Sequence, residues 1–467
     1  MTASAGEPGL SSEPAVPYTP DPQRWPGDNA DPRTAALHDP RSYVSGVPFD
    51  AIEELRADGP VAWVAEPELP GLPAGPGYHL VLSHSLVSSV LKDPATFSSS
   101  LGGTQIRDPA TGKDLRYVQR MMLNMDPPEH SRLRRMLNRS FTPRAIAALE
   151  GRIAEHAGLI VDRMLGGPAD CDFAKDVAAD LPLLALADVL GVPPEDRWLL
   201  FDWSNRVIGF LDSDYAVSAD FDATTGTGLA REAVSLRPEP DASGRMPDPR
   251  SRAGMPDLYR YAHLLGAAKR LDPGADVMSI LLAQMDDEGS QISVEEFENM
   301  FWLFAVAGNE TLRNGLPGGM IALLEHPDAQ RTLRADQGRF ETAVDEMLRW
   351  WTPVMVFRRT ATCAVMLGET AVAAGDKVVV SFTAANRDPD LFPHPDAFEI
   401  DRSPNNHLSF GHGPHFCLGA HLARSQMRAL FSELLGRTNW IEATGEPSYL
   451  RSNFQRGVKR LPIRWTA

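Results

Sequence analysis

The chain has 467 residues, a length that fits one large domain or about two to three smaller ones. It carries 45 Lys and Arg against 62 Asp and Glu. The resulting net charge of −17 argues against a nucleic acid or an anionic membrane surface as the main partner. Its three cysteines are too few for a disulfide framework or for a four-thiolate iron–sulfur cluster, and an odd count fits a reducing compartment.

The N-terminal stretch is rich in proline and lacks hydrophobic periodicity, so we expect residues 1–35 to form an extended, partly disordered leader. It has neither the basic region nor the apolar run of a secretory signal. A long uncharged stretch, residues 69–91, is interrupted by three prolines and three glycines and cannot form a membrane-spanning helix. We therefore expect a cytoplasmic protein that does not associate with membranes.

The remaining residues, 36–467, are expected to form one domain that is mainly α with a minor β portion. Between residues 49 and 91, short apolar runs between Pro and Gly clusters predict a small sheet with one or two helices. From about residue 126 to the mid-300s the apolar spacing is mostly helical. Residues 236–257, rich in Pro, Gly, Arg and Asp, interrupt this pattern and predict a mobile loop. Strand-like runs at 377–382 and at the C-terminus supply the β portion.

One predicted helix contains polar residues that a core helix does not need. It begins with a capping box, Ser293 to Glu296, and continues with an apolar stretch that packing alone explains. The sequence Ala-Gly-Asn-Glu-Thr at 307–311 then places an acid and an alcohol beside two small residues. Residues 315–319 contain three glycines and one proline. Because proline removes a helical hydrogen bond, we expect a bend or an early end of the helix there.

Several basic residues lie in predicted helices and strands. His130 and Arg134 are four residues apart in a helical pattern, so both face the same way. A strand-like run, PVMVFRRTA, carries Arg359. Glu346 and Arg349 lie three residues apart and can form an ion pair on one helix face, although such pairs occur on any solvated helix.

The most informative segment surrounds Cys417. Residues 410–419 (FGHGPHFCLG) place this cysteine where a glycine-rich turn leads into a helical pattern. Unpaired N–H groups and the helix dipole at such a position would stabilise a thiolate. Three interpretations are open: a buried structural cysteine, a haem iron with cysteine as its fifth ligand, or a zinc site. The zinc site would add His412, His415 and His421, whose spacing is irregular for that metal.

The spacing Phe410-x-x-Gly413-x-x-x-Cys417-x-Gly419 resembles, position by position, the signature loop of the cytochrome P450 family of haem-thiolate monooxygenases. The resemblance extends from about residue 40 to the C-terminus. It implies a triangular, mostly helical prism around haem b, with the Cys417 thiolate as the axial ligand of the iron.

The other motifs are similar to further parts of this family. The run at 307–311 resembles the distal helix, where a notch of small residues leaves room for dioxygen over the iron. This implies that Thr311 is the oxygen-activating alcohol and that Glu310 is the acid that relays protons to oxygen. The 346–349 pair resembles the family's Glu-x-x-Arg pair, and Arg402 is the candidate for the arginine that joins it.

The resemblance also implies which residues hold the haem and line the substrate pocket. Basic residues at matching positions would bind the two anionic propionates, for which arginine is well suited. The candidate haem contacts are His130, Arg134, Ala307, Arg359, Phe410, Gly411, His415 and Gly419. The candidate pocket residues, mainly apolar, are Phe304, Val354, Met355, Phe357 and Phe454.

The activity implied is the insertion of one oxygen atom from O2 into an apolar small molecule. Soluble actinobacterial members, which this sequence resembles most, suggest a steroid, terpenoid, fatty-acyl or aromatic natural product. No flavin- or dinucleotide-binding fingerprint is found, so electrons from NAD(P)H are expected to come through a separate ferredoxin and its reductase.

We expect a monomer that docks its ferredoxin at a local basic patch near the cysteine. The candidates for this patch are Arg132, Arg135, Arg139 and Arg424. A haem-thiolate peroxygenase or isomerase, which needs no redox partner, and a haem-binding sensor or carrier are the alternative functions.

Overall fold

The computed structural model describes residues 31–69, 73–109, 111–208, 223–241, 247–249 and 251–467. Residues 1–30, which make up most of the expected leader, lie outside these ranges. The described chain starts in helix α1 (Pro32–His38), whose first turn is capped by the Asp31 carboxylate. Regular structure therefore begins a few residues before the boundary that the sequence predicts.

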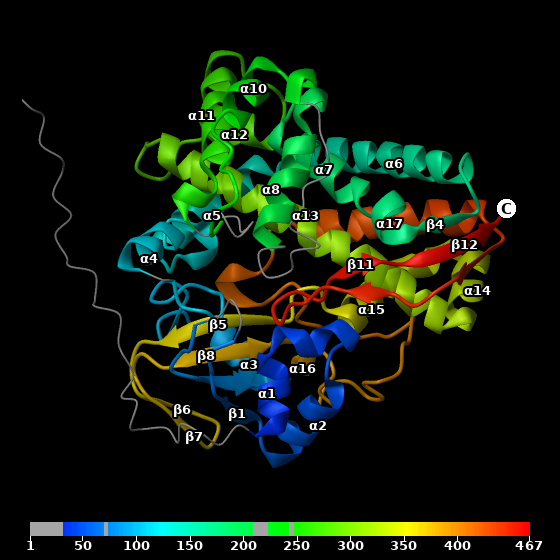
Figure 1. Cartoon of the computed structure of the whole chain (residues 1–467). Coiled ribbons are helices and arrows are strands. Elements are labelled where there is room, and N and C mark those ends of the chain that lie inside the picture. Colours follow the sequence, from blue (N-terminus) through cyan, green and yellow to red (C-terminus); the bar gives the residue numbers. More distant parts are fainter. Residues whose placement is uncertain (1–30, 70–72, 110, 209–222, 242–246, 250) are drawn as a thin grey trace, which may run out of the picture.

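Helices form most of the molecule and fill the upper and right-hand parts of Figure 1. The longest, α13 (Val294–Glu325), starts at the predicted capping box. There the Glu296 N–H donates to Ser293 Oγ, and the Ser293 N–H donates to the Glu296 carboxylate. The other helices of this region are α4 (Gly112–Val118), α5 (Glu129–Ser140), α6 (Pro143–Leu165), α7 (Asp180–Leu190), α8 (Trp198–Ile208), α10 (Gly228–Val234), α11 (Pro256–Leu271), α12 (Val277–Ala283), α14 (Pro327–Ala335), α15 (Phe340–Trp351) and α17 (Ala420–Arg437).

A small sheet lies in the lower part of Figure 1, beside α1 and three further helices. Its strand order is β1-β2-β8-β5-β3, with β2 and β8 parallel and the other neighbours antiparallel. The strands are β1 (Val61–Val64), β2 (Tyr78–Val81), β3 (Phe97–Ser98), β5 (Val356–Ala361) and β8 (Lys377–Ser381). The helices are α2 (Phe49–Asp58), α3 (His84–Lys92) and α16 (Phe382–Ala385).

Short strands outside this sheet form one three-stranded and two two-stranded pairings. They are β4 (Asp170–Asp172), β12 (Pro462–Thr466) and β9 (Trp440–Ala443); β6 (Val365–Leu367) and β7 (Thr370–Val372); β10 (Ser448–Tyr449) and β11 (Val458–Arg460). The described chain is thus mainly α with a minor β portion, as expected. None of its helices is long and apolar enough to cross a membrane.

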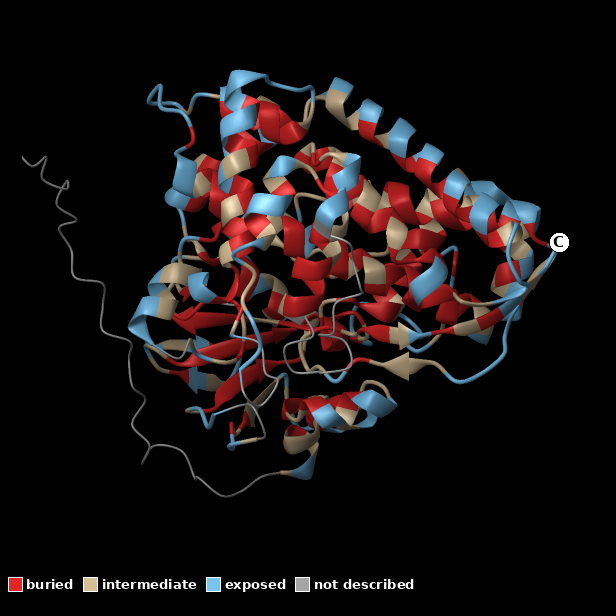
Figure 2. Cartoon of the chain, turned by 45° about the horizontal axis from the view of Figure 1, so that its top comes forward, coloured by how far each residue is buried: buried red, intermediate tan, exposed pale blue. Residues whose placement is uncertain are grey.

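Two large apolar clusters meet along α13. The N-terminal half of the helix, up to Ala305, packs with α5, α8, α11 and α12. The C-terminal half, from Leu312, packs with α6, α15 and α17. Between the two clusters, Ala307 and Gly308 are exposed, although most of the surrounding helix is buried. Figure 2 shows the buried residues concentrated in the interior and the exposed ones on the outer helices.

The expected early end of α13 is wrong, because the helix continues through Pro317 to Glu325. The glycines there serve close packing instead. A Cβ on Gly318 would lie 2.1 Å from Cγ of Trp351 in α15, and one on Gly319 would lie 3.0 Å from Phe431 in α17. The small residues let α13, α15 and α17 approach closely. This packing keeps α13 helical on both sides of Pro317.

The predicted mobile loop, 236–257, is corrected at its C-terminal end. Residues 242–246 and 250 lie outside the described residues. Helix α11 already begins at Pro256, and Asp257 is fully buried, where it accepts a hydrogen bond from Trp203 Nε1 at 2.8 Å. Asp248 forms an ion pair with Arg107 at 3.0 Å. These contacts fix the described parts of the segment to the rest of the molecule.

Candidate active site

The cysteine loop is held by backbone geometry that glycine permits. The Cys417 N–H donates to the Phe410 carbonyl at 2.9 Å. Gly413 has a φ of +68°, and a Cβ on it would lie 2.3 Å from the Leu91 carbonyl at the end of α3. The loop therefore lies tightly against the small sheet's helix and places Cys417 three residues before α17, close to where the sequence predicts.

Cys417 combines exposure to solvent with a dense protein surrounding. Burial raises the pKa of its thiol, while the Gly419 N–H and the charges of Arg134 and Arg424 act to lower it. Leu418, the next residue, packs against the cluster that contains the N-terminal half of α13. The cysteine loop therefore adjoins the helices that pack on that half of α13.

The notch of α13 carries the predicted alcohol. Thr311 is half-exposed, and its hydroxyl donates to the Ala307 carbonyl at 3.0 Å. Gly308 is needed for packing, because a Cβ there would lie 2.9 Å from Leu186 in α7. The exposed side of α13 therefore carries only small side chains and one hydroxyl, from Ala307, Gly308 and Thr311.

The four predicted basic residues gather beside the cysteine loop. The rings of His130 and His415 lie 4.1 Å apart, and His415 Nε2 is 3.3 Å from the Ser99 hydroxyl. Burial and the charge of Arg134 lower the pKa of His130 to about 4. Burial and Arg359 lower that of His415 to about 2. Both histidines are therefore neutral at pH 7.

Arg134 and Arg359 are the two arginines of this cluster. Arg359 is buried, and its Nη1 donates to the Arg358 carbonyl at 2.8 Å. Burial lowers its pKa to about 10. Among the described residues, no carboxylate forms an ion pair with either arginine. A buried guanidinium is costly without an anion, so this cluster is suited to bind one.

The predicted Glu346–Arg349 pair is formed, and it is buried instead of solvated. Arg349 Nε donates to the Glu346 carboxylate at 2.8 Å. Arg402 Nε lies 3.2 Å from the same carboxylate, so Arg402 joins the pair as predicted. Asn405 adds a third donor at 3.0 Å. Arg349 also donates to three backbone carbonyls between residues 386 and 397. The network ties α15 to the chain that leads into the cysteine loop.

Comparison with known proteins decides the family. The family model described as cytochrome P450 matches residues 267–465. A steroid C26-monooxygenase of Rhodococcus jostii is 34% identical over 91% of this chain and 83% of its own length. The chain belongs to the cytochrome P450 family. A methyl-branched lipid omega-hydroxylase of Mycobacterium tuberculosis is also 34% identical, over 89% and 90% of the two chains. This chain is accordingly a P450 monooxygenase.

The crystal structure of CYP108D1 from Novosphingobium aromaticivorans superposes on this P450 with a TM-score of 0.78. The two chains are 32% identical, and the match covers 93% of this one and 98% of the other. The expected triangular P450 fold is thereby confirmed. Family membership implies a haem whose iron is bound by a thiolate.

The residues present fit such a haem. Cys417 is exposed, and among the described residues the guanidinium groups of Arg134 and Arg359 near its loop form no ion pair with a carboxylate. Propionate carboxylates would supply the missing anions. The His130 Nδ1 atom is buried without a hydrogen-bond partner, so it too is free for a polar group of the cofactor.

The predicted pocket residues differ in how far they are buried. Phe304, Val354, Phe357 and Phe454 are partly exposed, and the rings of Phe357 and Phe454 lie 5.8 Å apart. Met355 is 2% exposed and packs in the core beneath the sheet. Met355 lies just before strand β5, which starts at Val356.

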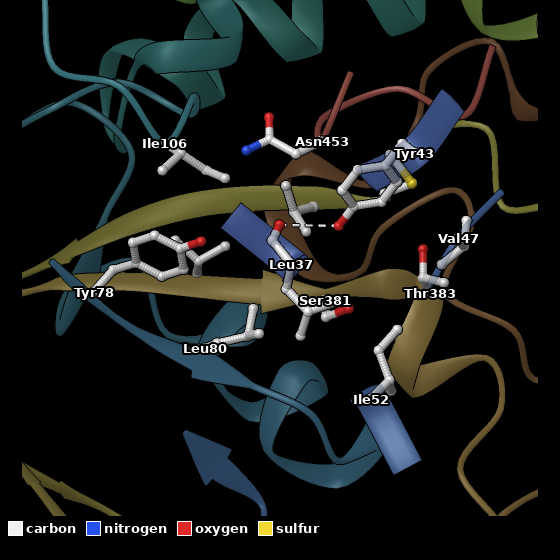
Figure 3. A pocket seen from close by; sticks show the side chains of 13 residues that line it. Leu37, Tyr43, Val47, Ile52, Tyr78, Leu80, Ile106, Ser381, Thr383 and Asn453 are labelled. Atoms are coloured by element: carbon white, nitrogen blue, oxygen red, sulfur yellow. Dashed lines mark hydrogen bonds between the residues drawn. The ribbon is translucent and has the colours of Figure 1, made fainter. Parts of the chain in front are cut away.

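Met355 instead borders a cavity on the sheet side of the molecule, drawn in Figure 3. The cavity has a volume of about 20 Å³, enough for roughly one water molecule and too small for a substrate. Tyr43, whose hydroxyl donates to the Leu37 carbonyl at 3.0 Å, forms part of its wall. None of its lining residues belongs to the cysteine loop.

Glu310 lies on a different side of α13 from the exposed notch. It is fully buried and accepts hydrogen bonds from Ser204 Oγ at 3.0 Å and from Arg313 Nη1 at 2.9 Å. Sequence analysis missed both partners. The spacing of Glu310 and Arg313, three residues apart, could have indicated the second. Nothing local could have indicated Ser204, which comes from α8, more than a hundred residues away.

The expected basic patch is present as a set of ion pairs. Each of its four arginines is bound to a carboxylate: Arg132 to Asp286 and Glu296, Arg135 and Arg139 to Asp287, and Arg424 to Asp345. Two of these four acids, Asp286 and Asp287, lie in the turn between α12 and α13, and all four are far from their arginines in sequence, so sequence proximity gave no sign of them. The patch has little net positive charge.

Proposed function

We propose that this P450 inserts one oxygen atom into a C–H bond of an apolar small molecule, with haem held by Cys417. The observation that carries the proposal is the exposed Cys417 thiol near the guanidinium groups of Arg134 and Arg359, neither of which forms an ion pair with a carboxylate among the described residues. The net reaction is R–H + O2 + 2 e⁻ + 2 H⁺ → R–OH + H2O. Among apolar substrates, the names of the two similar relatives favour a steroid or a methyl-branched lipid.

Haem, when bound, supplies dioxygen binding and reductive O–O cleavage at its iron. Cys417 would hold the iron as a thiolate, stabilised by the Gly419 N–H and the nearby arginine charges. Arg134, Arg359, His130 and His415 would hold the propionates by charge and hydrogen bonds. Phe410 would pack beside the ligand loop. Ala307, Gly411 and Gly419 would leave room for the ring system.

The reaction consumes two protons, which the chain must deliver in a pocket that excludes bulk water. Thr311 presents its hydroxyl on the exposed side of α13, and Glu310 is the adjacent acid. The substrate would lie against the aromatic side chains of Phe304, Phe357 and Phe454. These apolar walls favour a hydrocarbon skeleton and exclude competing water.

Two electrons are also consumed. We propose that they come from NAD(P)H through a ferredoxin reductase and a ferredoxin, that the protein acts in the cytoplasm, and that it is a monomer. The chain's lack of a dinucleotide-binding fingerprint supports an external donor.

The test is turnover of steroid and branched-lipid substrates under isotope-labelled dioxygen, with ferredoxin, reductase and NADH. The proposal expects one labelled oxygen atom in the product, and loss of product when the ferredoxin is omitted. Product formation that requires hydrogen peroxide and ignores NADH would favour a peroxygenase. Product without labelled oxygen would point to an isomerase. Either result would overturn the proposal.

A further inference from the structure

An ion pair joins α15 to α17 beside the cysteine loop. Arg424, in the second turn of α17, donates from Nε to the Asp345 carboxylate of α15 at 2.6 Å. The guanidinium carbon of Arg424 lies 4.5 Å from the centre of the Phe410 ring. Phe410 is the residue whose carbonyl accepts the Cys417 N–H. The ion pair therefore fixes a positive charge against a residue that holds the cysteine loop.

The same carboxylate also holds the start of the loop, through His407. The His407 side chain is 2% exposed, and its Nε2 lies 3.2 Å from Asp345 Oδ1. Its Nδ1 accepts the Ser409 N–H at 3.2 Å. A ring nitrogen that accepts a backbone N–H carries no proton, so Nε2 carries the proton and donates to Asp345. His407 thus adds a hydrogen bond to this cluster and no charge.

Two opposite charges remain in the cluster, one on Arg424 and one on Asp345. Burial raises the pKa of the Cys417 thiol, and the charge of Arg424 acts against this rise. The electrostatic influence of Arg424 therefore extends to the thiol. Asp345 offsets part of this influence, because it is the carboxylate that pairs with Arg424. Both side chains are about one quarter exposed, so solvent screens only part of their charges.

This arrangement bears on the electron that the reaction requires. Adding one electron to a haem at Cys417 adds one negative charge beside the thiolate. A fixed positive charge nearby favours this step, and a fixed negative charge opposes it. The reduction potential should therefore depend on where Arg424 lies and on how much of its charge Asp345 offsets.

We propose that Asp345 is a positioning residue for electron uptake, which holds Arg424 against Phe410 and so sets the reduction potential of the haem. The inference rests on the proposed function, in which Cys417 carries the haem and ferredoxin supplies the electron. The step is the uptake of one electron by the haem iron, and no bond of Asp345, Arg424 or His407 forms or breaks in it. Asp345 acts through Arg424 and has no assigned contact with substrate.

The test is the reduction potential of the haem-loaded protein, titrated with dithionite and small dye mediators. Arg424→Gln is expected to lower the equilibrium constant for one-electron reduction about tenfold, which makes the potential about 59 mV more negative. Asp345→Asn keeps an oxygen that accepts from Arg424 but loses the charge, so it should raise the constant about threefold. Arg424→Lys keeps the charge and should stay within about twofold of wild type. Because the dyes replace ferredoxin, a role of Arg424 in docking would not change these values.

Arg428→Gln is the matched control. Arg428 pairs with Glu341 at 2.7 Å across the same two helices, one turn farther along α17 from the cysteine loop. It should leave the potential unchanged. Equal potentials of Arg424→Gln and Arg428→Gln, or shifts of the same sign in Arg424→Gln and Asp345→Asn, would overturn the proposal.

The carbon monoxide spectrum separates this inference from the proposed function. A wild-type protein without the red-shifted Soret band would contradict haem binding by Cys417 itself. A normal band in every variant, with equal potentials, would contradict only the role of Asp345 and Arg424. If Arg424→Gln loses the band, Asp345→Asn decides: a raised potential supports the proposal, and an unchanged or lowered one overturns it.

Discussion

At the residue scale, Arg359 and its neighbour Arg358 offer a matched pair of buried arginines. Arg359 has no carboxylate partner among the described residues, whereas Arg358 pairs with Asp108 at 2.5 Å. We expect Arg359→Gln to weaken haem binding by about 2 kcal/mol, roughly 30-fold, because a charged hydrogen bond to a propionate is lost. Arg358→Gln should instead destabilise the fold and leave haem affinity nearly unchanged. Haem transfer to an acceptor protein measures the first effect and thermal unfolding the second. Equal haem retention by the two variants would contradict this role of Arg359.

The neutral state of His130 predicts how the haem-free protein responds to acid. Its pKa is lowered to about 4 by burial and by Arg134, against an ordinary value of 6.5. As the pH falls from 6.5 to 4, the unfolded chain therefore takes up a proton that the folded chain does not, and the folded state loses stability. We expect His130 to lower the free energy of unfolding by about 2 kcal/mol over this pH range, after allowance for its partial exposure to solvent. In His130→Gln this part of the pH dependence should vanish, as urea unfolding at several pH values would show. If the free energy of unfolding of His130→Gln fell with pH as steeply as that of wild type, the lowered pKa of His130 would be contradicted.

At the element scale, glycine spacing fixes how α13 packs. A Cβ on Gly318 would overlap the Trp351 ring at 2.1 Å, so Gly318→Ala should cost about 2 kcal/mol of unfolding free energy. Gly158, in α6, has nothing within 4 Å of its Cβ position. Gly158→Ala should therefore stabilise the protein by about 0.5–1 kcal/mol, because alanine favours helix. Similar unfolding temperatures for the two variants would show that the contact with Trp351 does not constrain α13.

At the scale of the whole molecule, the net charge of −17 and the paired arginines near Cys417 bear on electron transfer. Because Asp287 pairs with both Arg135 and Arg139 and offsets one of their two positive charges, the docking of the proposed acidic ferredoxin should gain little from long-range attraction. We expect the rate of haem reduction to change less than about threefold between low and physiological salt. Asp287→Asn should raise the rate at low salt and make it more salt-dependent. A steep salt dependence in wild type would contradict this picture.

Local patterns predicted the parts of this protein whose chemistry lies within a few residues. The cysteine loop, the capping box at Ser293 and the pair at Glu346 and Arg349 all depend on neighbours in sequence. Arg402 was also placed correctly, although this assignment came from the resemblance to a family and not from spacing alone.

The features that local patterns did not predict depend on contacts between distant residues. Helix α13 passes through Pro317 because Trp351 and Phe431 pack against its glycines. Met355, just before β5 begins at Val356, is buried in the core beneath the sheet. Glu310 is held by Ser204 from α8. In each case the deciding partner is far away in the chain, where periodicity and spacing carry no information.

The central claim is that Cys417 binds haem iron as a thiolate. The most direct measurement is the absorption spectrum of the reduced protein with and without carbon monoxide, for wild type and Cys417→Ala. The account predicts a strongly red-shifted Soret band in wild type that is absent from the variant. A folded wild-type protein without a haem band, or a red-shifted band that persists in Cys417→Ala, would contradict it.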